Sequence, residues 1–172
     1  KRRNWAGDPA AFADFPDYVL AHEVAHQWWG QAVGTKSYHD QWISEGFAQY
    51  FAALYAEQRK EPAVFRDILR TMTKSAIDSS PQGPIWLGYR LGHIKGDSRV
   101  FRSLVYNKGA MVLHMLRRLI GDEVFFAGLR DFYSGFRFRK AGADDVRHAF
   151  ERAAGRSLER FFDQWIHGSA VP

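Results

Sequence analysis

Two histidines and a glutamate in the first third of the chain are spaced to bind one metal ion. His22 and His26 enclose the motif His-Glu-Val-Ala-His, so on an α-helix both imidazoles lie on one face and can reach the same tetrahedral zinc ion. Eighteen residues separate His26 from Glu45 in Trp-Ile-Ser-Glu-Gly. That length allows a helix end, a turn and an antiparallel second helix. The spacing therefore predicts Glu45 as the third zinc ligand.

Glu23 is placed to act as a base beside this metal site. It follows the first histidine directly and precedes the second by three residues, so its carboxylate points beside the ligand face and can take a proton from a water molecule without binding the metal. The alternative is a pair of structural histidines on an apolar helix, because this short motif also arises by chance. Glu45 and the absence of cysteine favour a hydrolytic zinc site built from His and carboxylate ligands.

Composition predicts a globular chain and excludes several other classes. The 172 residues are 46% hydrophobic and 16% aromatic, which is ample for one buried core. The net charge is +5, but Lys and Arg are scattered among Asp and Glu, so nucleic-acid binding is disfavoured. Without a stretch of about eighteen uninterrupted apolar residues, no membrane span is predicted. The sequence does not indicate a cellular compartment.

The elements that must position the site are expected to be helices. Start signals at Asp14, Pro16 and Asp17 predict a first helix that runs past Trp28 and stops near Gly30. After a polar, turn-like segment over 34–40, a second helix is predicted over 44–59. Glu45 then falls in the first turn of that helix, where packing can hold its carboxylate rigidly.

The remaining two thirds of the chain also favour helices. A third is predicted from Pro62 or Ala63 to about Ile77. The run from Ser79 to Gly96 is rich in Gly and Pro and predicts a long irregular loop. Further helices are expected over 106–120, 122–135, 143–154 and 157–166. No internal repeat or linker is visible, so residues 1–172 are interpreted as one mainly α unit.

Three motifs together resemble one family of zinc peptidases. They are His-Glu-Val-Ala-His-Gln-Trp-Trp-Gly from residue 22, Trp-Ile-Ser-Glu-Gly-Phe-Ala from residue 42, and Val-Tyr-Asn-Lys-Gly-Ala at 105–110. The chain is similar to the aminopeptidase N and leukotriene hydrolase family of gluzincin metallopeptidases. The resemblance implies that His22, His26 and Glu45 bind one Zn²⁺, that Glu23 is the general base, and that Tyr106 stabilises the tetrahedral oxyanion.

The same resemblance implies a fold and a function. The chain looks like the zinc helix and helical lobe of a thermolysin-like catalytic domain whose sheet-bearing part is absent. It is thus expected to be a single partial catalytic domain of a longer protein, with peptide substrates and the remaining domains of that protein as partners. The implied activity is removal of N-terminal residues from peptides.

One family motif has no equivalent in this sequence. The family's Gly-x-Met-Glu-Asn segment, which grips the substrate's free amino group, lies upstream of the zinc helix, and only about twenty residues precede His22 here. Exopeptidase specificity is therefore implied by resemblance alone, and the isolated chain is expected to be weakly active or inactive. Three alternatives stay open: a catalytically silent scaffold for protein interactions, an epoxide hydrolase and an endopeptidase.

Overall fold

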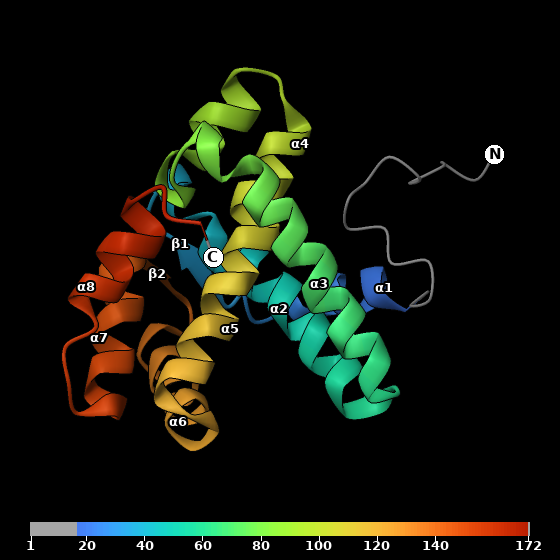
Figure 1. Cartoon of the computed structure of the whole chain (residues 1–172). Helices are drawn as coiled ribbons and strands as arrows, with labels where there is room; N and C mark the ends of the chain where they lie inside the picture. The colour runs from blue at the N-terminus through green and yellow to red at the C-terminus, as the bar shows by residue number, and fades with distance from the viewer. Residues whose placement is uncertain (1–16, 172) are drawn as a thin grey trace.

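The computed structural model describes residues 17–171, and most of them are helical (Figure 1). The predicted start signals Asp14 and Pro16 lie outside these residues. The mainly α class predicted from the sequence is confirmed. The α-helices are α1 Tyr18–Ala25, α2 Trp42–Arg59, α3 Pro62–Ser79, α4 Ser98–Phe101, α5 Gly109–Ile120, α6 Asp122–Phe136, α7 Ala143–Ala154 and α8 Glu159–Phe162.

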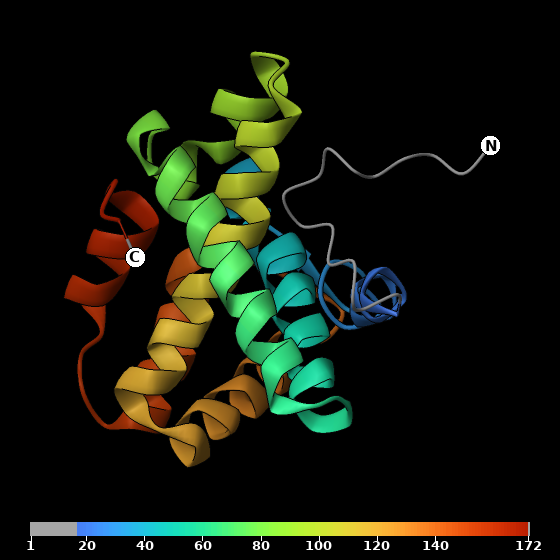
Figure 2. The ribbon, with the colours of Figure 1, turned by 45° about the vertical axis from the view of Figure 1, so that its right-hand side comes forward.

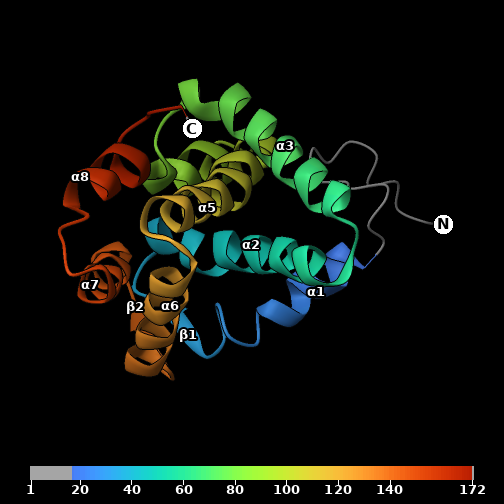
Figure 3. The same ribbon diagram turned by 60° about the horizontal axis from the view of Figure 1, so that its bottom comes forward.

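Helix α2 is the centre of the fold. It lies between α1 on one side and α5 on the other, and α3 packs across both α2 and α5 (Figure 3). Helices α7 and α8 stand at the end of the molecule away from α1 in every view (Figures 1 and 2). Because α2 is enclosed by its neighbours, it buries residues around most of its circumference, among them Phe47, Ala48, Tyr50 and Ala52. The site-bearing first turn of α2 is thereby held by a packed core.

Two short strands form a sheet that the sequence did not reveal. β1 Val33–Thr35 pairs in parallel with β2 Arg139–Ala141, with Val33 opposite Arg139. The segment predicted to be turn-like thus contains part of β1 and a short 3₁₀ turn, Tyr38–Asp40. A strand of three residues is too short to show the alternation on which strand prediction depends. The pair ties the chain after α1 to the distant α6–α7 connection.

The predicted irregular loop over 79–96 is wrong, because the segment is a series of helical turns. They are the 3₁₀ turns Ser80–Gln82 and Ile85–Leu87 and the π-helical turn Tyr89–Ile94. A Cβ atom at Gly92 would overlap the backbone of Phe101, and one at Gly88 would meet Val105. These glycines permit close packing of two helical segments, which local sequence cannot distinguish from a loop signal.

Two helix boundaries also differ from prediction. The helix expected from Tyr106 starts earlier, at Ser98, and passes through a π-helical segment, Arg102–Lys108, before α5. Helix α1 stops at Ala25 instead of continuing past Trp28. After it, the Val33 amide donates to the Trp28 carbonyl and Gly30 adopts a φ of +108°. The apolar pattern extended the predicted helix, although the Trp28 side chain is 46% exposed.

A close crossing of α2 and α5 gives the first testable prediction. A Cβ atom on Gly46 would lie 3.1 Å from both the Cα atom of Gly109 and the Val105 carbonyl oxygen, so a side chain there must push two backbones apart. Gly46→Ala is expected to lower the free energy of unfolding by about 1–3 kcal/mol. Chemical denaturation measures this change. Gly135→Ala in α6 is the control, because its Cβ would meet open space; equal stability of the two variants would contradict the prediction.

The helices show no membrane-spanning character. Among the residues described, none of the helices combines the length and the apolar composition that a bilayer crossing requires.

Candidate metal centre

Three side chains from α1 and α2 converge on one point. His22 and His26 lie one turn apart on and directly after α1, and Glu45 is in the first turn of α2. The two Nε2 atoms are 3.1 Å apart. Glu45 Oε2 is 3.5 Å from Nε2 of His22 and 3.3 Å from Nε2 of His26. Within residues 17–171, this is the one group of His, Cys, Asp or Glu side chains arranged to hold a metal ion.

The geometry of these donors fits zinc. Tetrahedral coordination with bonds of about 2.0–2.1 Å places ligand atoms about 3.3 Å apart. The three observed separations, 3.1, 3.3 and 3.5 Å, lie on either side of this value. Two imidazoles and one carboxylate leave a fourth position open, which is the arrangement of a catalytic rather than a structural zinc site.

The backbone after α1 fixes the orientation of the His26 ring. Its Nδ1 lies 2.9 Å from the Trp29 carbonyl and 3.3 Å from the Ser44 hydroxyl. Donation from Nδ1–H to that carbonyl leaves the Nε2 lone pair free for a metal. The carbonyl is available because α1 ends at Ala25, and Gly30 lets Ser44 approach, since a Cβ at Gly30 would overlap the Ser44 hydroxyl.

His22 is held differently. It is buried, and its ring stacks almost parallel to the Tyr106 ring at a centroid distance of 5.6 Å. Its Nδ1 atom is buried and has no hydrogen-bond partner in the described part of the chain. Packing therefore orients this ring, where a hydrogen bond orients His26.

Electrostatics keep the carboxylate ligand ionised. Burial by itself would raise the pKa of Glu45, but hydrogen bonds with His22 and His26 outweigh it and lower that pKa to about 2. The same hydrogen bond also raises the pKa of His26. A metal ion and a proton would compete for Nε2 of His26, because only the neutral imidazole is a ligand.

The two residues expected to assist the reaction lie close to the cluster. Glu23 is exposed, and its negative charge contributes to raising the pKa values of His26 and Tyr106. Tyr106 lies in the π-helical segment, where burial first and then the charge of Glu45 raise the pKa of its phenol. The Tyr106 hydroxyl therefore stays protonated and can donate a hydrogen bond. Residue spacing alone does not distinguish Tyr106 from the other six tyrosines; the motif around it supplied the signal.

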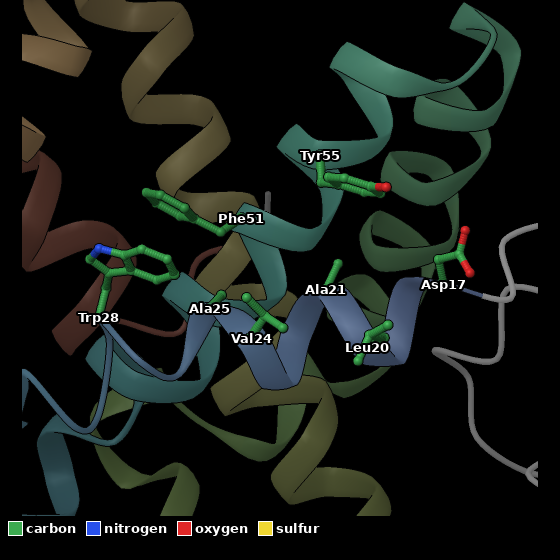
Figure 4. A pocket seen from close by; sticks show the side chains of 8 residues that line it. All are labelled: Asp17, Leu20, Ala21, Val24, Ala25, Trp28, Phe51 and Tyr55. Carbon is green, nitrogen blue, oxygen red and sulfur yellow. The ribbon is translucent and has the colours of Figure 1, made fainter.

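The pocket beside α1 is separate from the candidate metal centre. This cavity of about 510 Å³ lies between α1 and α2 and has a mainly apolar lining, to which Phe51 and Tyr55 contribute from α2 (Figure 4). None of the three candidate ligands, nor Glu23 or Tyr106, lines it. The α1 residues around it include the exposed side chains of Leu20 and Val24. Helix α1 thus has the candidate ligand His22 on one face and an apolar, partly exposed surface on another.

Several solved structures are similar to this fold. A mutant M1 zinc metallopeptidase from Deinococcus radiodurans, bound to a Tyr-Ser-Ala substrate, superposes with a TM-score of 0.72 at 26% identity; the match covers 93% of this chain and 35% of that one. The unmutated enzyme from the same organism gives a TM-score of 0.69 at 26% identity, with 91% of this chain and 34% of that chain covered. The helical architecture described above is therefore that of the helical lobe in these enzymes.

Sequence relatives point to the same group. Tricorn protease-interacting factor F2 of Thermoplasma acidophilum is 30% identical over 158 residues, covering 90% of this chain and 20% of that protein. Aminopeptidase N of Lactococcus lactis is 29% identical, covering 90% and 19%. Glutamyl aminopeptidase of Sus scrofa is 31% identical, covering 90% and 17%. The chain spans about a fifth of the length of these relatives. The model of the peptidase family M1 domain matches residues 16–165, and this chain accordingly belongs to peptidase family M1.

Proposed function

We propose that this chain supplies the zinc ligands and the reacting side chains of a metallo-aminopeptidase. The observation that carries the proposal is the meeting of His22, His26 and Glu45 with donor separations of 3.1–3.5 Å. Within the proposal, residues 1–172 form a single partial catalytic domain. The longer protein that contains this domain removes residues from the N-termini of peptides.

Each side chain has a distinct task in this mechanism. Nε2 of His22, Nε2 of His26 and a carboxylate oxygen of Glu45 would hold one Zn²⁺. When bound, zinc polarises the scissile carbonyl and makes water a better nucleophile near neutral pH. Glu23 takes the proton from the attacking water and later delivers it to the leaving amine.

Tyr106 stabilises the oxygen of the scissile carbonyl. As negative charge develops there, the protonated phenol donates a hydrogen bond to it. The raised pKa of Tyr106 keeps this donor in its neutral form. Since water is the nucleophile, the mechanism involves no covalent acyl-enzyme.

The remaining domains of the longer protein are proposed as partners. Glu23 is exposed, so the described residues do not enclose the base on all sides. Nearby on α1, Val19, Leu20 and Val24 expose 54%, 65% and 48% of their surface. Exposed apolar surface of this kind is characteristic of an interaction site. With the cleft incomplete, the isolated chain is expected to be weakly active or inactive.

A defined substrate panel tests the proposal against its alternatives. Full-length protein is loaded with zinc, its metal content is measured, and it is assayed on an aminoacyl anilide, on the same anilide with an acetylated N-terminus, and on an epoxide. The proposal expects one zinc per chain and turnover of the free aminoacyl anilide only. Cleavage of the acetylated substrate would indicate an endopeptidase, turnover of the epoxide an epoxide hydrolase, and zinc without any turnover a silent scaffold.

A further inference from the structure

A buried chain of hydrogen bonds joins α2, α3 and the π-helical segment next to the candidate metal centre. The Gln49 side-chain amide donates to the side-chain oxygen Oδ1 of Asn107 at 2.9 Å. The Asn107 amide donates to the Ser75 hydroxyl at 2.9 Å, and Ser75 donates to the Ser103 hydroxyl at 2.9 Å. All four side chains belong to residues that are at most 5% exposed. We call Gln49, Asn107, Ser75 and Ser103 the buried relay.

The relay connects the elements that carry the site residues. Gln49 lies one turn after Glu45 in α2, and Asn107 is adjacent to Tyr106 in the π-helical segment. The Tyr18 hydroxyl, one turn before His22 in α1, donates to the backbone carbonyl of Gln49 at 3.0 Å. Each of the three site-bearing elements thus has a hydrogen-bonded group within one helical turn of its site residue.

Hydrogen bonds constrain the relative positions of α2, α3 and the π-helical segment in a way that apolar packing does not. Apolar side chains tolerate small sliding and repacking, whereas a buried amide must keep its partners or lose their energy. Asn107 has both a donor and an acceptor partner, one on α3 and one on α2. A buried hydrogen-bonded network of this kind rigidifies one arrangement of its elements.

The backbone around Tyr106 has particular need of such a constraint. A π-helix is rare and is found mostly as single turns, frequently at functional sites. Here Arg102–Lys108 is π-helical, and Ser103 and Asn107, four residues apart within it, both bond to the Ser75 hydroxyl. Ser75 on α3 therefore holds the π-helical segment at two points on either side of Tyr106 in sequence.

We propose that Asn107, through the buried relay, is a positioning residue that holds the Tyr106 hydroxyl in register with His22 and Glu45. Asn107 acts on the reaction only through the placement of Tyr106. The expected effect on turnover rests on the proposed function, in which Tyr106 donates to the developing oxyanion. The expected effect on the position of Tyr106 does not.

The kinetic test uses zinc-loaded full-length protein with variants at two relay positions. Asn107→Ala and Ser75→Ala are expected to lower kcat by about 10- to 100-fold, the effect of misplacing a reacting group by about 1 Å, with KM and zinc content unchanged. Ser80→Ala is the control: Ser80 is also a buried serine, directly after α3, but its hydroxyl donates to the Ala76 carbonyl, outside the relay. Equal kcat values for Ser75→Ala, Ser80→Ala and the parent would overturn the proposal.

A double-mutant cycle separates positioning from general destabilisation. In a Tyr106→Phe background, Asn107→Ala is expected to cause little further loss of kcat, because the hydroxyl that it positions is already gone. Full additivity of the two changes would refute the proposal. Asn107→Ser, which keeps a short hydrogen-bonding side chain, replaces Asn107→Ala if the latter does not fold.

Crystal structures of the same variants give a readout that needs no turnover. Asn107→Ala is expected to displace the Tyr106 hydroxyl from Glu45 and His22 relative to the parent protein, and Ser80→Ala is expected to leave it in place. An unmoved Tyr106 in the Asn107 variant would overturn the inference. A parent protein that binds zinc but hydrolyses no substrate would instead refute the proposed function, and the position of Tyr106 would still decide the inference.

Discussion

Replacing Glu23 with Gln is expected to leave zinc bound and to lower kcat by about 10²- to 10⁴-fold, the usual contribution of a general acid–base residue. Gln has the same shape as Glu but its amide cannot accept the proton from water. Glu23 is exposed and lies outside the cluster of three donors, so neither the fold nor the zinc content should change. Metal analysis and steady-state kinetics of the full-length protein on an aminoacyl anilide measure both quantities.

The control for this variant is Glu159→Gln. Glu159 is an exposed glutamate in α8, at the end of the molecule away from α1 (Figure 1). Glu159→Gln should retain the parent kcat. Parent-level turnover by a verified Glu23→Gln protein would exclude Glu23 as the base.

Replacing His26 with Ala is expected to remove zinc and turnover together. Loss of even an outer-shell partner of a metal ligand weakens binding by 10- to 100-fold, so loss of the ligand itself should weaken zinc binding by more than about 100-fold. The substitution also removes one of the two histidine hydrogen bonds that lower the pKa of Glu45 to about 2. The Glu45 carboxylate is then held less firmly. Zinc titration against a competing chelator measures the affinity.

His148→Ala provides the comparison for His26→Ala. His148 is exposed on α7 and belongs to no metal-binding group among residues 17–171, so its loss should change neither zinc affinity nor kcat. Zinc bound by the His26 variant with parent affinity would rule out His26 as a ligand. Together, the Glu23 and His26 variants separate loss of chemistry from loss of the metal.

The candidate metal ligands could be selected from the sequence because much of their arrangement is local. The four-residue spacing of His22 and His26 is set by the helical repeat, and Glu45 falls in the first turn of its helix as predicted. Prediction failed where tertiary neighbours decide the conformation. The glycines over 79–96 read as loop residues, but Gly88 and Gly92 are packing contacts against a segment that follows later in the chain.

Tyr106 could be selected by its motif, but its position in the site depends on the tertiary structure. It lies 84 positions after His22 in the sequence, and no helical period connects the two, so only the motif around it indicated a role. The structure places its ring against His22 at a centroid distance of 5.6 Å. That contact depends on how α1 and the π-helical segment each pack against α2.

The sequence by itself determined the candidate metal ligands, the helices that position them and the family of the chain, because helical period and motif identity are properties of neighbouring residues. Only the tertiary structure decided how the Ser44 hydroxyl comes within 3.3 Å of His26 Nδ1 and how Asn107 joins α2 to α3 beside Tyr106. Such contacts form between segments far apart in the chain. They are set by packing of the whole core, which the spacing of neighbouring residues does not predict.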